Sequence, residues 1–210
     1  MTAILKVDTI QDTSGNNIIN ESSDTITIGA SGDTTNIVGT LQNNGSALNF
    51  ATVNGITMAD QWRLTADKSN VDNGTVFDSN LERVDTSGQG TIGTAMSESS
   101  GIFTFPSTGI YWVQAVITYK KDASRRYVGV NIQATTNNSS YSEITQNYSL
   151  INPPDGNDAY ANVTSNTYID VTDTSNVKIK FNGLTPATIT AQGNTTQNTT
   201  TFTFIRLGDT

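Results

Sequence analysis

The sequence predicts an all-β protein in which a thin N-terminal segment precedes a compact C-terminal β-sandwich knob. Short runs rich in β-branched and aromatic residues alternate with polar positions, and clusters of Gly, Asn, Ser and Pro separate them. No window of useful length shows the 3.6-residue period of an amphipathic helix. Every Phe, Trp and Tyr lies from Phe50 onward, so residues 1–49 lack the side chains that contribute most to core burial.

The N-terminal segment has too few apolar residues to fold alone. Between Ile4 and Leu41 they come singly or in pairs, as in 25–29 and 36–39, with turn-forming residues between them. Such a chain cannot offset the backbone entropy of ordering, about 1–2 kcal/mol per residue. We therefore expect neighbours to hold it: either identical chains wound about a threefold axis as a fibre shaft, or another protein on whose surface a single chain lies. This assigns residues 1–55 to a shaft or attachment segment and residues 56–210 to the knob.

The strands of the knob follow from alternation. Residues 110–119 predict a central strand of a sandwich, with one face in the core and the other half-covered; the core face carries Tyr111, Val113, Ala115, Ile117 and Tyr119. Further strands are expected at 127–132, 177–181 and 201–207. The dipeptides Asn73-Gly74 and Asn182-Gly183 predict turns.

Charge and hydropathy exclude several classes of partner. The net charge is −8 and only 14% of residues are charged, so a nucleic-acid partner, which needs clustered Lys and Arg, is not expected. The basic pairs 120–121 and 125–126 are interpreted as a solvated hairpin loop or as donors of ion pairs between subunits. Residues 1–6 contain no apolar core of a signal peptide and no stretch approaches ~18 apolar residues. We expect synthesis in the host cytoplasm and no membrane insertion.

The residue types available for catalysis are few. The chain has no His and no Cys, which excludes a Ser-His-Asp triad and zinc sites built on His or Cys. A glycosidase could use paired carboxylates such as Glu143, Asp155 and Asp158, although nothing in the sequence pairs them. Calcium could bind at 155–158, or at Asp170 with Asp173. Because loop carboxylates are usually solvated or cap turns, we expect no enzyme and no cofactor, with calcium left open.

Residues 101–113, GIFTFPSTGIYWV, resemble the G-x-F-x-x-P-x-x-G-x-Y-x-F/V signature in the globular-head jelly roll of the complement first component and its tumour-necrosis-factor relatives. The resemblance extends over roughly residues 60–210 and implies a jelly roll that forms tight homotrimers and binds partners. The residues that carry the signature, expected in the core or the trimer interface, are Phe103, Phe105, Pro106, Gly109, Tyr111, Trp112 and Val113. Trp62 is expected to pack at the base of the knob.

Residues 5–15, LKVDTIQDTSG, are similar to the start of many bacteriophage tail-fibre and structural proteins. This similarity implies a virion protein: a trimeric fibre whose N-terminal segment contacts other virion proteins and whose knob binds a host surface glycan or protein. A capsid decoration protein and a secreted carbohydrate-binding or hydrolysing module are the alternatives. Loops opposite the shaft, 152–160 or 135–142, are expected to contact the receptor.

Overall fold

All regular secondary structure in the described residues is β-strand, which confirms the predicted all-β class. The computed structural model describes residues 38, 42–43, 46–47, 55–153 and 155–210. The chain divides into two units, Met1–Val53 and Asn54–Thr210. In the first, β1 (Gln42–Asn43) pairs antiparallel with β2 (Ser46–Ala47). The expected strand at 25–29 lies outside the described residues.

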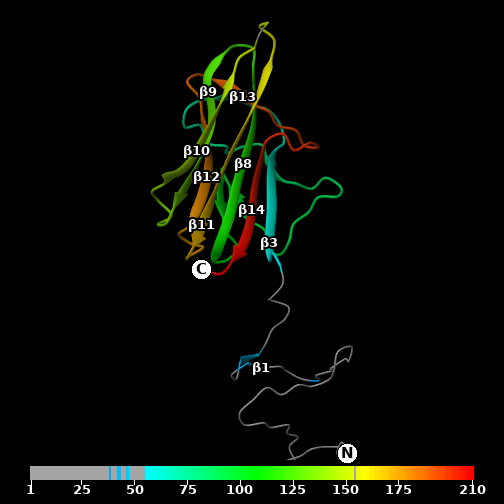
Figure 1. The fold of residues 1–210 in the computed structure, drawn as a ribbon, viewed down its shortest axis with the longest axis vertical. Helices are drawn as coiled ribbons and strands as arrows, with labels where there is room; N and C mark the ends of the chain where they lie inside the picture. Colours follow the sequence, from blue (N-terminus) through cyan, green and yellow to red (C-terminus); the bar gives the residue numbers. More distant parts are fainter. Residues whose placement is uncertain (1–37, 39–41, 44–45, 48–54, 154) are drawn as a thin grey trace, which may run out of the picture. The chain divides into compact units, whose positions relative to one another are not determined.

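The second unit is a sandwich of two antiparallel sheets (Figure 1). The seven-stranded sheet has the order β4-β13-β8-β14-β3-β5, with β11 on the free side of β8. Its strands are β3 (Met58–Leu64), β4 (Lys68–Val71), β5 (Leu81–Arg83), β8 (Gly109–Lys121), β11 (Ala159–Val171), β13 (Ile189–Ala191) and β14 (Thr201–Gly208).

The five-stranded sheet has the order β10-β9-β12-β7-β6. Its strands are β6 (Ser97–Ser99), β7 (Ile102–Thr104), β9 (Arg125–Thr135), β10 (Ser142–Ile151) and β12 (Lys178–Leu184). Strand β10 lies beside β11 of the other sheet without a backbone ladder. Instead, Asn147 Nδ2 donates to the carbonyl of Thr164 at 2.9 Å, and the hydroxyls of Thr145 and Ser165 are 3.3 Å apart. These side-chain contacts cover edges that would otherwise present unpaired backbone groups.

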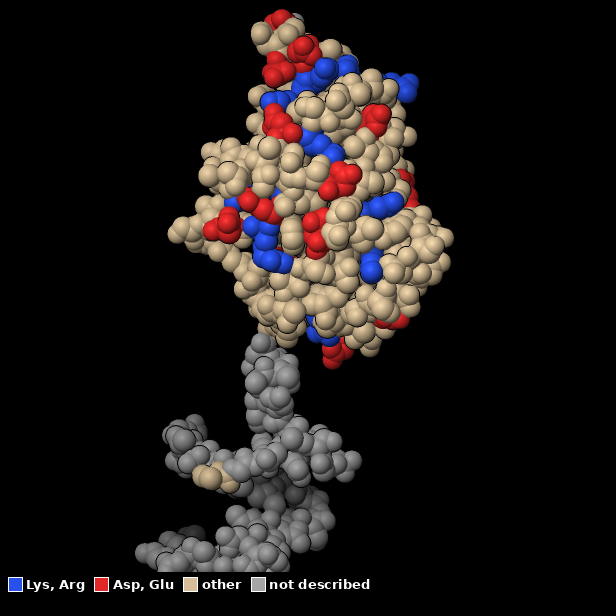
Figure 2. Space-filling view, turned by 180° about the vertical axis from the view of Figure 1, so that it is seen from behind, with Lys and Arg blue, Asp and Glu red and all other residues tan. Residues whose placement is uncertain are grey.

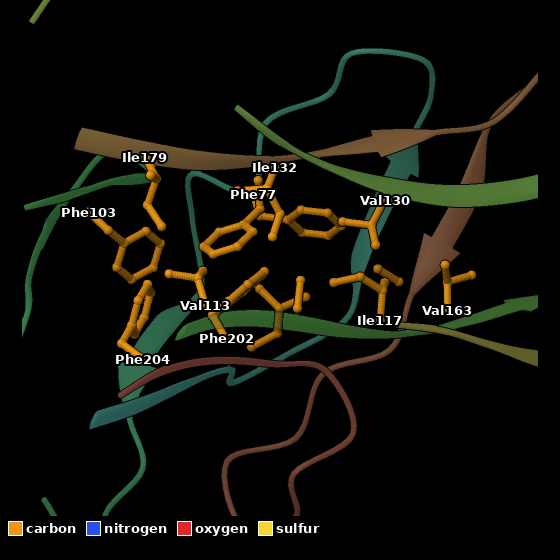
Figure 3. Packing of buried hydrophobic residues seen from close by; sticks show 14 of the residues in the cluster. Phe77, Phe103, Val113, Ile117, Val130, Ile132, Val163, Ile179, Phe202 and Phe204 are labelled. Carbon is orange, nitrogen blue, oxygen red and sulfur yellow. The ribbon is translucent and has the colours of Figure 1, made fainter. Parts of the chain in front are cut away.

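The core fills the space between the two sheets (Figure 3). Phe103 of β7 packs against aromatic rings of both sheets: its ring centroid lies 5.0 Å from that of Phe204 and 5.5 Å from that of Phe181. Strand β8 alternates buried and half-buried positions along its length, so the predicted alternation of 110–119 is confirmed. Aromatic pairs at these separations add about 0.5–1.5 kcal/mol each beyond the burial of their area.

One predicted turn is wrong. Asn73-Gly74 does form a turn, but Asn182 and Gly183 lie inside β12. The glycine is needed for packing rather than for turning, because a Cβ at Gly183 would lie 2.3 Å from Cγ1 of Val71. The Asn-Gly pair therefore marks a close approach between the sheets, which in sequence has the same appearance as a hairpin turn.

The directions of the strands determine at which end of the sandwich each loop lies. Strand β3 begins at Met58 beside the end of β14, so residue 58 and the C-terminus share one end (Figure 1). The 135–142 loop is at this same end, where Asn138 N donates to Asn176 O. The 152–158 loop is at the opposite end. There the hydroxyl of Ser124, in the turn after β8, donates a hydrogen bond to Oδ1 of Asn152. Of the two loops expected to contact the receptor, 152–160 lies at the end opposite residue 58, whereas 135–142 lies at the same end as residue 58. Receptor contact by either loop stays a prediction.

Candidate assembly face and partner-binding surfaces

The signature residues build one corner of the knob. Phe103, Phe105, Tyr111 and Val113 are all buried in the core. The rings of Phe105 and Tyr111 lie 4.7 Å apart, and the Tyr111 hydroxyl donates to Ser107 O at 2.9 Å, which closes the turn that holds Pro106.

Gly109 starts β8 with a φ of 140°, and a Cβ there would lie 2.5 Å from Gly208 O. This position therefore excludes a side chain, both by conformation and by space.

Trp112 has a different place from the other signature residues. It projects from β8 on the face opposite the core and is half-buried in the single chain. Register aligns it with Tyr168 of β11 on one side and with Ile205 of β14 on the other. Tyr168 is 68% exposed. The outer face of the seven-stranded sheet thus carries a transverse apolar row, Tyr168–Trp112–Ile205, which we call the apolar row.

One neighbouring row of this face is polar. Asn166, Gln114, Thr203 and Gln61 follow one another across β11, β8, β14 and β3. Gln61 Nε2 donates to the Thr203 hydroxyl at 2.8 Å, and Asn198 Nδ2 donates to Gln61 Oε1 at 3.0 Å. Amide and hydroxyl side chains on an exposed sheet can form hydrogen bonds with a partner or with water at little cost.

A buried arginine closes the far end of the same face. Arg63 of β3 is fully buried, and its guanidinium donates to Glu82, Asp85 and Thr86. A further bond to Asn198 fastens the loop before β14 over it. Burial alone would raise the pKa of Glu82, but the hydrogen bonds from Arg63 and Thr195 and the Arg63 charge outweigh it, so this pKa lies below its ordinary value.

Trp62 is in β3 with its ring toward the core. It meets Phe103 edge-on at 5.7 Å, its Nε1 donates to the buried carboxylate of Asp60 at 3.0 Å, and the guanidinium of Arg83 stacks on it. Asp60 also accepts bonds from Arg83 and from the backbone N–H of Met96. The carboxylate therefore anchors the loop between β5 and β6 to the edge of the sheet.

The carboxylates considered for catalysis do not meet. Glu143 lies at the start of β10, whereas Asp155 and Asp158 lie in the loop beyond its end. Asp155 accepts a bond from the N–H of Asn157, and Asp173 accepts bonds from Ser175 and Asn176. Asx-type hydrogen bonds account for these acidic loop residues. Within the described residues, no group of three or more His, Cys, Asp or Glu side chains could hold a metal ion.

The basic residues at the end of β8 and the start of β9 have local partners. Lys120 pairs with Asp67 at 2.6 Å, and Lys121 lies 3.6 Å from Asp122. Arg125 donates to the carbonyls of Ser124 and Thr188, and Arg126 lies over the ring of Tyr127. These contacts agree with the interpretation of a hairpin-loop cluster. No helix in the described part of the chain is long and apolar enough to cross a membrane.

Comparison with solved structures relates this sandwich to known folds. Eiger TNF from S. frugiperda superposes with a TM-score of 0.58 at 12% identity, over 74% of this chain and 96% of that one. Murine APRIL, crystallised at pH 5.0, superposes with a TM-score of 0.50 at 13% identity, over 71% of this chain and 98% of that one. The fold is a tumour-necrosis-factor-like jelly roll.

A third structure, the PRD1 vertex protein P5, covers 74% of this chain and 100% of its own at 14% identity, with a TM-score of 0.43 that is too low to carry a conclusion. No protein-family model and no curated protein matches the sequence. The jelly-roll fold predicted from residues 101–113 is thus confirmed, while the chain's own role rests on its residues.

Proposed function

We propose that the chain is a non-enzymatic structural protein of a bacteriophage virion, a homotrimeric fibre whose C-terminal knob binds the host surface. In this proposal residues 1–55 form the shaft or attachment segment, which contacts other virion proteins, and residues 56–210 form the trimerising knob. The observation that carries it is the apolar row on the outer face of a tumour-necrosis-factor-like sandwich.

The apolar row supports the proposed trimer because it exposes large apolar side chains to solvent in the single chain. Tyr168 is 68% exposed, and Trp112 and Ile205 are half-buried. A contiguous set of large apolar side chains on a sheet face is typical of a protein contact rather than of a solvated surface. Three copies gathered about an axis along this face would bury the rows against one another. The neighbouring amides and hydroxyls would then form hydrogen bonds across the contact.

The positions of the loops at the two ends of the sandwich agree with a knob that the virion presents to the host. The chain enters the sandwich at residues 55–58, and the 152–158 loop lies at the other end with the turn 122–124. In this proposal, loops at the end of the sandwich opposite residue 58 are the first to meet a surface in front of the particle. Virion placement itself rests on the similarity of residues 5–15 to phage fibre proteins and on the low charge and high Thr and Asn content.

The test of this function is competition for adsorption. The purified full-length chain, added to host cells ahead of the phage, should occupy the receptor and lower the adsorption rate in a dose-dependent manner. Immunogold labelling with antibodies to the chain should mark the tail of the particle. Label spread over the capsid, with adsorption unchanged at saturating protein, would contradict host binding and favour the decoration alternative.

A further inference from the structure

The outer face of the five-stranded sheet carries a second organised surface, distinct from the apolar row. In β9, Val128, Val130 and Ile132 face the core, so the residues between them face outward. Register then places three amide side chains in line across β10, β9 and β12: Gln146, Asn131 and Asn182. We call this line the amide row.

Two members of the amide row have unsatisfied acceptors. Asn131 and Asn182 are 3% and 4% exposed, and the Oδ1 atom of each accepts no hydrogen bond from the described part of the chain. The orientation of Asn131 is set by its Nδ2, which donates to the carboxylate of Glu143 and so leaves Oδ1 as the free acceptor. Buried carbonyl oxygens without donors are rare in folded proteins, and each calls for a donor from outside the chain.

Aromatic rings border the amide row on one side. The ring of Tyr148 lies over Gly129, where a Cβ would come within 2.7 Å of it, and meets Tyr127 edge-on at 5.4 Å. Its hydroxyl donates to Gln146 Oε1, and the side chain remains 53% exposed. Partial burial, followed by the charge of Glu143, raises the pKa of Tyr148. The ring is thus held in place beside the amides with one surface open to solvent.

The opposite border is charged. Glu143, Gln133 and Lys180 are aligned by register in the next row, and Lys180 Nζ lies 4.4 Å from the ring centroid of Tyr141. On the face of the knob seen in Figure 2, Lys and Arg lie scattered among Asp, Glu and many uncharged residues. Glu143 is exposed and lies on the edge strand β10, so its side chain can change rotamer without repacking the core.

We propose that the amide row and Tyr148 form a glycan-binding site that takes a hexose residue of a host-surface polysaccharide. A pyranose has hydroxyl groups, which donate to the free oxygens of Asn131 and Asn182 and accept from amide N–H groups and Lys180. It also has an apolar C–H face, which packs on an aromatic ring held as Tyr148 is. The inference rests on the proposed host-binding function and names its ligand class.

A divalent cation fits this surface less well. Its oxygen ligands would be two neutral amides and the single carboxylate of Glu143, a set with little negative charge compared with calcium sites that hold several carboxylates. Lys180 in the adjacent row adds a positive charge close by. The mixture of donors, acceptors and an exposed ring is the kind of surface that a neutral, hydroxyl-rich ligand satisfies.

The experiment uses the labelled full-length chain on an array of purified bacterial O-antigen and capsular polysaccharides. The site predicts retention on at least one hexose-containing polysaccharide. Tyr148→Ala and Gln146→Ala should each weaken that binding at least tenfold. Tyr160→Ala is the matched control: this tyrosine is 60% exposed on β11 of the other sheet, and its loss should leave binding unchanged. No retention on any polysaccharide, or binding that both site variants keep, overturns the proposal.

Binding of the same labelled proteins to intact host cells separates this inference from the function on which it rests. If cells bind the wild type and Tyr148→Ala equally, host binding stands and the site is wrong. If cells bind neither protein, but the array retains the wild type and not the variant, the glycan site stands and host recognition fails. Thermal unfolding midpoints that match the wild type's show that loss of binding in a variant is not loss of fold.

Discussion

The Nε atom of Arg63 donates a 2.8 Å hydrogen bond to Oε1 of Glu82, with the arginine side chain only 1% exposed and the glutamate 28% exposed. The pair lies where β3 and β5 meet, and the remaining guanidinium donors reach Asp85, Thr86 and Asn198. A single cation thereby links the sheet edge to two loops. Its charge is shielded from water, so its bonds contribute more than those of a surface pair.

Replacing Arg63 by Met tests this contribution. The change removes the hydrogen bonds but keeps most of the buried volume, and Glu82 and Asp85 can turn to solvent. We expect the free energy of unfolding to fall by about 1–3 kcal/mol, measured by urea denaturation. Lys121→Met, which removes a partly exposed pair with an N···O separation of 3.6 Å, should change stability by less than about 0.5 kcal/mol. Equal losses in both variants would contradict a special role for the buried pair.

Acid should weaken the same interaction. The pKa of Glu82 is lowered from its ordinary value of 4.5 in the folded protein. A carboxylate whose folded pKa is depressed stabilises the fold fully above its unfolded pKa and loses this contribution as pH falls through the folded pKa. We therefore expect Arg63→Met to cost less stability in acid, once the pH has fallen through the folded pKa of Glu82, than at pH 7. A cost that is the same at both pH values would show that Glu82 does not titrate with folding.

Gly109 should tolerate no side chain. In Gly109→Ala the Cβ would lie 2.5 Å from Gly208 O, and the φ of 140° is unfavourable for an L-residue. The expected loss is about 1–3 kcal/mol of unfolding free energy, seen as a lower thermal midpoint. Gly208→Ala, at the partner position of this contact, has open space around its Cβ and should be near neutral. A neutral Gly109→Ala would mean that the turn before β8 relaxes freely.

Trp112 should be needed for assembly rather than for the core. Trp112→Glu places a charge in the apolar row, where three copies would bring like charges together. The variant should sediment as a monomer and keep the far-ultraviolet circular dichroism of a β-sandwich. Gln133→Glu, a matched change on the outer face of the other sheet, should leave the assembly intact. If Trp112→Glu remains assembled, the apolar row is not the interface.

Much of the knob could be predicted because its core strands obey simple alternation. Strand β8 alternates along its length, and the resemblance carried by residues 101–113 implied the jelly-roll fold. Trp112 was harder to assign, since alternation places it opposite Tyr111 and Val113 but does not say what covers that face. From the sequence, Trp112 could lie either in the core or in a subunit interface. The structure shows that Trp112 does not belong to the buried core.

Other elements were missed for identifiable physical reasons. Strand β3 contains Asp60 and Arg63 at buried positions, so it lacks the apolar pattern of a core strand, and its charges are satisfied by residues distant in sequence. Strand β10 presents mostly Asn, Ser, Thr and other polar side chains and forms an edge of its sheet. The amide row depends on the register between three strands, and local sequence does not specify register.

The mass of the full-length chain in solution tests the central claim most directly. Sedimentation equilibrium over a range of protein concentrations should give three times the 22.4 kDa of one chain, with no dissociation to monomer at micromolar concentration. This result would agree with a knob that assembles through the apolar row. A mass of 22.4 kDa at every concentration would contradict the trimeric fibre.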